Sequence, residues 1–502
     1  MAHSRNSFIL HWQSVLYVIG LILAFSSLSL FLPLGTSIWY QEWKAFYALL
    51  SSMGVGLTSG GLLYLLFRKN FNPHCLKQRE ACFIVTFAWL GIAGLGALPY
   101  LLGGVFPQAG GNWFSAITEA YFEAMSGFTT TGASVMTEIE IFPRSLLLWR
   151  AETQWLGGMG IILLSVAILP LLGVGGLQLF KAEVPGVSVD KVTPRISETA
   201  KHLWLVYAGL TALEITALMF AGMDFYNAVC HSFTTLSTGG FSPQNISVEH
   251  FHSAWVDWII TVFMMLGGMN FVLLYKITRK QFKPVLKDPE FRVYSAISAL
   301  AVLLLVFNLL LSGTYSSASE AFRHGAFQMA SIMTTTGFSS ANWENWPVFS
   351  QALLLTLMLL GGMAGSTAGG CKTVRLIILI KYTLRELAMI IHPRAVISLK
   401  LSGHPISRDV IRSVLAFFAI FNLMILFSTL TLAAMGVDLI TSISAVISSL
   451  GNVGPGLARV GAAHNYHHLP DLAKWLLVFC MLLGRLEIYT AIVLFIPDFW
   501  KK

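Results

Sequence analysis

Charged residues are scarce in this chain. Asp, Glu, Lys and Arg make up 11% of its 502 residues, and apolar residues make up 55%, whereas soluble domains typically carry roughly 25% charged residues. The apolar residues also form many runs long enough to cross ~30 Å of hydrocarbon. This composition excludes a soluble enzyme with a single anchor and predicts a polytopic α-helical membrane protein. The first run, Val15 to Leu34, exceeds a signal-peptide core, so we expect it to remain as a span.

Catalytic and metal-binding signatures are also missing. The sequence has no G-x-S-x-G, no H-E-x-x-H and no pair of aspartates within a span, so we expect neither enzyme activity nor a cofactor. "HNYHH", from His464 to His468, has no accompanying acidic residue and is interpreted as a solvated external loop rather than a metal site. The cysteines lie far apart without C-x-x-C spacing and predict no disulfide or zinc site; they are Cys75, Cys82, Cys230, Cys371 and Cys480.

Basic residues are concentrated in alternate loops, and the net charge is +8. This positive-inside pattern places the basic loops, and with them both termini, in the cytoplasm. No soluble basic face is visible, so we expect no binding to nucleic acid. The four basic clusters are Arg68, Lys69, Lys77 and Arg79; Lys181, Lys191, Arg195 and Lys201; Lys276, Arg279, Lys280, Lys283 and Lys287; and Lys372, Arg375, Lys381, Arg385, Arg394 and Lys400.

One unit recurs four times after two opening spans at about 13–33 and 45–67. Each unit has a long apolar run (M1), a short amphipathic run and a second long run (M2). The short runs cannot span a membrane and predict re-entrant half-helices. The M1 runs are 81–103, 202–222, 292–313 and 410–435; the short runs are about 113–127, 225–236, 319–333 and 438–449; the M2 runs are about 146–172, 255–276, 350–384 and 472–497. We predict an N-terminal pair at 1–70 and repeats at 71–180, 181–290, 291–402 and 403–502.

A tract of small residues ends each short run. The tracts read "TTTGA", "LSTGG", "TTTGF" and "GNVGP", and we align them through Gly132, Gly239, Gly337 and Gly454. A second motif follows each tract, "WLGGMG" at Trp155, "MLGGMN" at Met265, "LLGGMA" at Leu359 and "LLGRLE" at Leu482. Chance does not readily explain two motifs that recur four times in the same order.

The tracts have the chemistry of a cation filter. Non-helical backbone at membrane depth is tolerated only where it is buried in protein or lines an aqueous path. Glycine with φ > 0 lets successive carbonyls replace a hydration shell. The alternative is a close helix-packing surface, and the tracts alone do not choose between potassium and sodium. The predicted filter residues are Thr130, Thr131, Gly132, Ser237, Thr238, Gly239, Thr335, Thr336, Gly337, Asn452, Val453 and Gly454.

The third M2 run is interrupted by "GGMAGSTAGGCKT", Gly361 to Thr373. Glycine costs ~1 kcal/mol against alanine in a helix, so we predict two half-helices joined by a loop rather than a tightly packed small-residue helix. A phosphate loop is excluded because Cys371 separates Gly370 from Lys372. The loop is a candidate gate, with Gly361, Gly362, Gly365, Gly369 and Gly370 as its glycines.

Arg485 lies well inside the last span, at the position of the second glycine in the other "GGM" motifs. A charge there is expensive and usually faces a cavity or a partner. Glu487 is only two residues away and does not share its helix face. Arg485 is therefore either part of an ion pair with another helix or a charge near the conduction path that raises the barrier to cations.

With these four units, the tracts, the broken third M2 and the arginine, the chain resembles the Trk/Ktr/HKT superfamily of potassium transporters, most closely its bacterial TrkH type. The resemblance covers nearly the whole chain. It implies an all-α fold with four pseudosymmetric M1–pore-helix–M2 repeats around a central pore, plus two N-terminal helices. It further implies one filter glycine per repeat and a gate loop beneath the filter. The fourth tract, "GNVGPG", departs most from the pattern.

The resemblance also implies a setting and partners. These are the bacterial inner membrane with its lipid, a homodimer, and a separate cytosolic ring that binds nucleotides. Serine at the first filter position accompanies sodium transport in plant relatives, so Gly132 favours potassium as the transported ion. We expect channel-like potassium uptake. A symporter coupled to H+ or Na+ is the alternative, although four units in one orientation favour a pore over inverted repeats.

Overall fold

The computed structural model describes residues 10–72, 76–106, 112–163, 192–395, 397–401 and 403–501. In these residues the chain is mostly helical and divides into two compact units. Unit 1 comprises residues 1–125, 142–149 and 486–502; unit 2 comprises 126–141 and 150–485. Each is described by itself, and the last part of the first M2 run, 164–172, lies outside the described residues.

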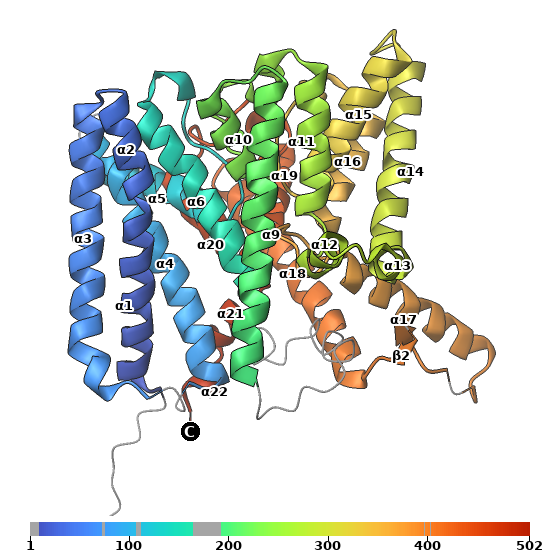
Figure 1. Cartoon of the computed structure of the whole chain (residues 1–502). Helices are drawn as coiled ribbons and strands as arrows, with labels where there is room; N and C mark the ends of the chain where they lie inside the picture. Colours follow the sequence, from blue (N-terminus) through green and yellow to red (C-terminus); the bar gives the residue numbers. More distant parts are fainter. Residues whose placement is uncertain are drawn as a thin grey trace, which may run out of the picture. The chain divides into compact units, whose positions relative to one another are not determined.

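Unit 1 holds the opening helices and the first M1 helix. α1 (Trp12–Ser29), α2 (Phe31–Trp39) and α3 (Trp43–Phe67) are followed by α4 (Gln78–Gly103), and α1 and α3 run side by side (Figure 1). Small residues allow this approach, since a Cβ on Gly60 would lie 2.7 Å from the Gly20 carbonyl oxygen. The remaining elements are η1 (Arg68–Asn70), most of α5 (Trp113–Phe128), the start of α6 (Arg144–Leu163), α21 (Tyr489–Ile492), η10 (Val493–Phe495) and α22 (Pro497–Trp500).

Unit 2 contains the second and third repeats, most of the fourth and part of the first. Its M1 helices are α9 (Val192–Phe220), α14 (Pro289–Leu311) and α18 (Arg408–Ala434); its half-helices are α10 (Phe225–Leu236), α15 (Ala318–Met333) and α19 (Leu439–Gly451). The M2 segments comprise α11 (Ala254–Gly267), α12 (Phe271–Thr278), α16 (Val348–Leu360), α17 (Thr373–Ile391) and α20 (Asp471–Arg485). Connecting elements are η4 (Ile139–Ile141), η7 (Ser247–Phe251), α13 (Phe282–Lys287), η8 (Trp343–Asn345), η9 (Ala458–Val460) and the antiparallel strands β1 (Lys400–Leu401) and β2 (His404–Pro405).

Six helices in the described residues are long and apolar enough to cross a membrane, so the expectation of a multi-span, mostly helical protein is confirmed. The half-helices are shorter, at 12 to 16 residues. Asp224 and Asp438 cap the N-termini of α10 and α19. The carboxylate of Asp438 accepts hydrogen bonds from the backbone and hydroxyl of Thr441, which lowers its pKa.

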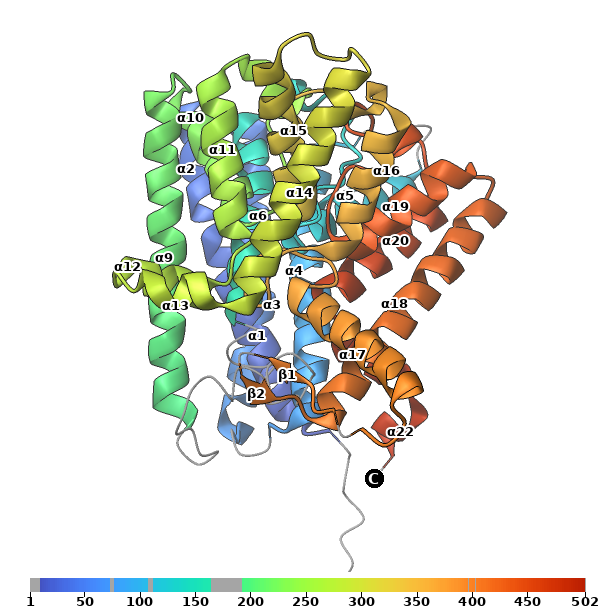
Figure 2. The ribbon, with the colours of Figure 1, turned by 90° about the vertical axis from the view of Figure 1, so that its right-hand side faces the viewer.

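The second M2 differs from its prediction as one continuous span. α11 and α12 are bent by 109° after Gly267 and Gly268, so α12 and α13 lie crosswise to α9 (Figures 1 and 2). The break is stable because Asn270 caps α12, its side chain accepting from the Val272 amide at 2.8 Å. The fourth M2 is also shorter than predicted, since α20 ends at Arg485 and Glu487 and Ile488 take positive φ.

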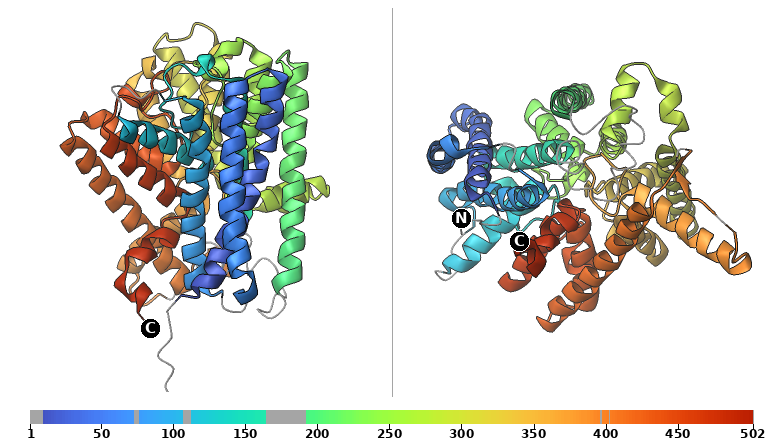
Figure 3. Two further views of the ribbon diagram at one scale, coloured as in Figure 1. Left: turned by 90° about the vertical axis from the view of Figure 1, so that its left-hand side faces the viewer. Right: turned by 90° about the horizontal axis from the view of Figure 1, so that it is seen from below.

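The third M2 is divided as the sequence predicts. α16 ends at Leu360 and α17 begins at Thr373, with a loop of residues 361–372 between them. α17 then runs obliquely, and the view from below shows its far end projecting from its neighbours in unit 2 (Figure 3). The loop therefore belongs to neither helix and makes no part of their regular backbone hydrogen bonding.

Candidate functional site

All four half-helices end in the same turn. In each turn one amide just beyond the helix bonds to the carbonyl three residues back, and the next amide bonds to the carbonyl five residues back. In α5 these bonds are Thr130 N to Gly127 O (2.9 Å) and Thr131 N to Ser126 O (2.9 Å). This is a Schellman motif, which needs one residue in the left-handed region. That residue is Thr130, Thr238, Thr335 or Asn452, with φ between 50° and 58°.

A β-branched residue rarely adopts a positive φ, and holding one there costs of order 1–3 kcal/mol. Glycine would fill the position without strain, yet three of the four repeats use threonine. At Thr335 the side chain makes a contact that offsets part of this strain. The Thr335 hydroxyl accepts a hydrogen bond from the Gly369 amide at 2.7 Å, and the hydroxyl of Thr130 is buried without a hydrogen-bond partner in the described part of the chain.

A second positive φ follows two residues later in every tract, always at glycine. These glycines are Gly132, Gly240, Gly337 and Gly454, with φ of 82°, 77°, 84° and 101°. The alignment of the second tract through Gly239 is therefore wrong by one residue. Gly239 is the equivalent of Thr131, and Gly240 is the equivalent of Gly132. Two adjacent glycines look alike in sequence, and only the backbone conformation separates them.

The four glycines form a closed ring of contacts. A Cβ on Gly132 would lie 2.2 Å from the Gly239 carbonyl oxygen, and one on Gly240 would lie 1.9 Å from that of Thr336. The ring continues from Gly337 to the Val453 oxygen at 2.1 Å and closes from Gly454 to the Thr131 oxygen at 2.7 Å. Each tract thus packs against the carbonyl that precedes the glycine of the next tract. No other residue type fits these four positions without displacing a neighbour.

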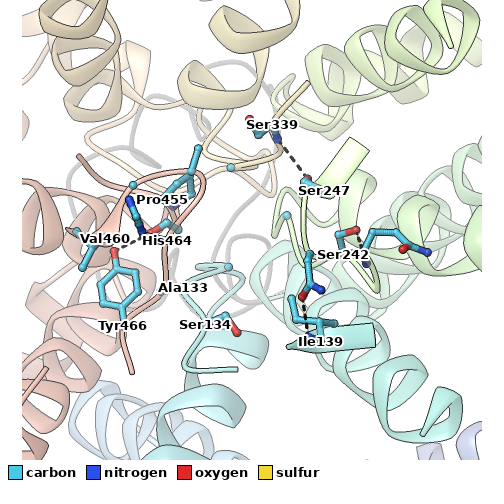
Figure 4. A pocket seen from close by; sticks show the side chains of 18 of the residues that line it. Ala133, Ser134, Ile139, Ser242, Ser247, Ser339, Pro455, Val460, His464 and Tyr466 are labelled. Carbon is cyan, nitrogen blue, oxygen red and sulfur yellow. Dashed lines mark hydrogen bonds between the residues drawn. The ribbon is translucent and has the colours of Figure 1, made fainter. Parts of the chain in front are cut away.

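A pocket of about 90 Å³, open on one side, lies at the ring. All four positive-φ glycines line it, and Figure 4 shows Ala133, Ser242, Ser339 and Pro455, one residue from each repeat, arranged around it. At the fourth tract, Asn452 donates from Nδ2 to Thr131 Oγ1 and to the Met481 carbonyl, both at 2.9 Å. Its Oδ1 is buried and has no hydrogen-bond partner among the described residues. This leaves oxygen atoms available beside the tracts.

Two side chains of α6 that the sequence analysis did not select hold the second tract. Gln154 donates from Nε2 to the Gly239 carbonyl at 2.7 Å and accepts from the Phe241 amide at 3.0 Å. Arg150 donates to the Ser242 carbonyl at 2.9 Å and lies 3.5 Å from the Phe241 ring centre. A run of polar residues inside the apolar first M2 run is the sequence signal that could have identified these two side chains.

The loop of residues 361–372 lies against these tracts. The Thr367 hydroxyl donates to the Leu236 carbonyl at 2.9 Å and to the Gly267 carbonyl at 3.0 Å. The Met363 amide donates to the Gly268 carbonyl at 2.9 Å. Gly361, Gly365 and Gly370 take positive φ, and Gly362 and Gly369 pack too closely for a Cβ. The break in the second M2 and the loop in the third M2 therefore hold each other in place.

Arg485 joins this loop to the first repeat. Its guanidinium donates to the Thr367 carbonyl at 2.7 Å and to the Gly157 carbonyl at 3.0 Å, and its side chain is buried. Across the described ranges no carboxylate forms an ion pair with it. Its guanidinium is therefore bound by backbone carbonyl oxygens, and not by a carboxylate on another helix. Arg485, the last residue of α20, therefore contacts the loop directly.

The histidine tract, His464 to His468, was expected to have no acidic residue beside it, and the structure differs on this point. His464 lines the cavity, and its Nε2 lies 3.9 Å from a carboxylate oxygen of Glu344. An acidic residue therefore does accompany it, although it comes from another repeat and is invisible in the local sequence. A search of the residues that the structure describes finds no group of three or more His, Cys, Asp or Glu that could hold a metal ion.

Comparisons with known proteins agree on one family. Residues 76–502 match the TrkH family, described as a cation transport protein. The chain is 38% identical over 495 residues to the Trk system potassium uptake protein TrkH of Escherichia coli, covering 98% of this chain and 100% of that protein. It is 39% identical to TrkH of Halomonas elongata, covering 98% and 99%. The crystal structure of the potassium transporter TrkH from Vibrio parahaemolyticus matches with a TM-score of 0.89 and 36% identity, covering 98% and 100%.

The corrected register makes a testable prediction at Gly240. Gly240→Ala should lower the thermal unfolding temperature of the purified protein by several degrees, because the new Cβ overlaps the Thr336 oxygen in the neighbouring tract. Gly222→Ala is the matched control, since Gly222 has φ of 95° and no atom within 4 Å of its Cβ position. Its change should reflect backbone strain alone, ~1 kcal/mol or somewhat more. Equal losses in the two variants would contradict the ring.

Proposed function

This chain belongs to the TrkH family of cation transport proteins, and we propose that it carries potassium into a bacterial cell through a channel-like pore. The observation that carries the proposal is the closed ring of four tracts, whose glycines all line one pocket. Peptide oxygens held this closely are able to replace the water that a cation gives up. The half-helices α5, α10, α15 and α19 each end at a tract, and their negative C-terminal ends favour a cation there.

The proposed filter follows the corrected register. Each tract contributes three consecutive residues: the left-handed residue, the residue after it and the positive-φ glycine. In the second tract, Ser237 comes directly before these three residues. We assign Gly240 to the ring in place of Gly239, which keeps a filter position one residue earlier. Glycine at position 132 is consistent with potassium rather than sodium. The proposed residues are Thr130, Thr131, Gly132, Thr238, Gly239, Gly240, Thr335, Thr336, Gly337, Asn452, Val453 and Gly454.

The loop of residues 361–372 is proposed as the gate, with Arg485 as its electrostatic component. The loop bonds to Leu236 and Thr335 at the inner ends of two tracts, a position that would obstruct ions leaving the filter. A buried guanidinium close to that path raises the barrier to cations. Conduction would require the loop to move, and Thr367 to part from Arg485, Leu236 and Gly267.

The proposed setting is the bacterial cytoplasmic membrane with both termini in the cytoplasm. The relatives' names refer to a Trk system, and we infer a homodimer whose cytosolic side docks a nucleotide-binding regulatory ring. The basic segments at 276–292 and 372–412 are the surfaces suited to that partner or to anionic lipid. Potassium is the cargo in this proposal, and no cofactor takes part.

Coupled symport is the second candidate, and one observation favours it. Glu214, in α9, is fully buried, and both its carboxylate oxygens lack a hydrogen-bond partner among the described residues. Its neighbour Thr235 donates its hydroxyl to the His231 carbonyl instead. An ionisable group inside a membrane span is by default a functional candidate, and this one could bind a proton.

The two mechanisms predict different reversal potentials in proteoliposomes. A channel should give a current that reverses at the potassium equilibrium potential whatever the pH gradient. A proton symporter should shift the reversal potential with the pH gradient, and Glu214→Gln should abolish that shift. If the reversal potential of Glu214→Gln still depends on the pH gradient, Glu214 is not the group that couples protons to potassium.

Growth of a potassium-uptake-deficient bacterium at low potassium tests the substrate. The chain, expressed with its cytosolic partner, should restore growth, and Gly132→Ser and Gly337→Ser should reduce the rescue at least severalfold because both side chains enter the neighbouring tract. Gly313→Ser is the control, since its Cβ position is open. Correct insertion without rescue counts against potassium as the substrate.

Neutralising the buried arginine tests the gate. Arg485→Gln should raise potassium flux by roughly tenfold, since a barrier lowered by only ~1.4 kcal/mol has that effect on a rate. Arg412→Gln removes an exposed positive charge on α18 and should leave flux unchanged. A deletion within residues 363–368 should act in the same direction as Arg485→Gln. Unchanged flux in both the substitution and the deletion would remove the gate role.

A further inference from the structure

A buried carboxylate lies against both ends of the gate loop. Glu290, the second residue of α14, is 8% exposed. Its Oε1 accepts hydrogen bonds from the Ala364 amide at 2.8 Å and from the Val374 amide at 3.0 Å. These two amides stand near the beginning of the loop and just after its end, so one oxygen atom joins the two sides of the loop.

The contact at Val374 supplies what α17 lacks. The first amides of a helix have no acceptor within the helix, and α17 begins after Lys372, which has φ of 62° and makes no side-chain capping bond. Glu290 therefore caps α17 from another helix. A negative group is also favoured at this end by the helix dipole. α14 and α17 are neighbours in unit 2 (Figure 2).

The other attachments of the loop are of a different kind. Thr367 and Gly369 connect it to the tracts and to Arg485, on the side of the proposed filter. Glu290 connects it to the first turn of α14, which Asp288 caps by accepting from the Phe291 amide at 2.9 Å. α13 and the basic segment that precedes it lead directly into that turn. A displacement of the segment would be transmitted to the loop through Glu290.

We propose that Glu290 is the positioning residue of the gate loop. It clamps both ends of residues 364–374 to α14, and the loop leaves its closed position only when the start of α14 moves or the clamp is broken. This inference rests on the proposed gate role of the loop for its functional consequence. The clamp itself is a structural claim and has a readout independent of potassium transport.

The loop contains its own probe in Cys371, which is 3% exposed. The full-length protein in proteoliposomes would be treated with a charged methanethiosulfonate reagent, and modification of each cysteine followed by peptide mass spectrometry. Glu290→Ala should raise the modification rate of Cys371 about tenfold or more, as expected for losing the two hydrogen bonds that hold the loop. Cys230 and Cys480, buried in α10 and α20, are internal references and should stay unreactive.

Two further variants test whether the hydrogen bonds of Glu290 matter, rather than its negative charge or a general loosening of the protein. Glu290→Gln keeps an oxygen that can accept from both amides, so Cys371 should remain close to wild type. Asp288→Asn removes a negative charge from the same turn while keeping a capping oxygen, and it should change nothing. If Glu290→Ala fails to insert, Glu290→Asp keeps the charge but shortens the reach, and it should again expose Cys371.

Potassium flux measured on the same preparations distinguishes the two proposals. Raised Cys371 reactivity with raised basal flux supports the clamp and the gate together. Raised reactivity with unchanged flux supports the clamp and refutes the gate role of the loop. Unchanged Cys371 reactivity in Glu290→Ala overturns the clamp, as does a parallel rise at Cys230 and Cys480, and either result leaves potassium uptake standing.

Discussion

A peptide group that leaves a helix inside a membrane must still find a partner, and this requirement shapes the whole of unit 2. Four half-helices stop partway, and each leaves carbonyl oxygens without helical donors. The Schellman turns satisfy some of them, and side chains such as Gln154, Ser331 and Ser448 satisfy others. The tract glycines line a common pocket, and in the proposed function a cation is the partner of the remaining oxygens.

The ring explains why glycine recurs in two separate motifs. The tract glycines must admit a carbonyl from the next repeat, and the paired glycines of M2 must admit the end of a half-helix. A Cβ on Gly157 would lie 1.9 Å from the Phe128 oxygen, and one on Gly484 would lie 2.1 Å from that of Leu450. In the third repeat the equivalent Gly361 turns the chain out of the helix instead, with φ of 71°. The same small residue therefore gives close packing in three repeats and a loop in one.

Departures from fourfold symmetry coincide with the proposed control elements. Asn452 replaces a threonine and uses its amide to bridge Thr131 and the Met481 carbonyl. Arg485 replaces a glycine and reaches both the first repeat and the loop. Glu290 reaches the loop from α14. A ring needs near-equivalence to hold an ion, whereas a gate needs one segment that differs from the rest; in the proposal Asn452 belongs to the ring, and Arg485 and Glu290 act on the gate.

The spans, the half-helices, the tracts and the interruption at Gly361 could all be predicted from the sequence, because apolar run length and the helix cost of glycine are local properties. The choice between Gly239 and Gly240 could not, since it depends on which residue meets the Thr336 oxygen of another repeat. The bend after Gly268, the support from Gln154, the Glu344–His464 pair and the contact of Glu290 with the loop were hidden for the same reason. Each depends on partners far apart in the chain, and only tertiary packing brings those partners together.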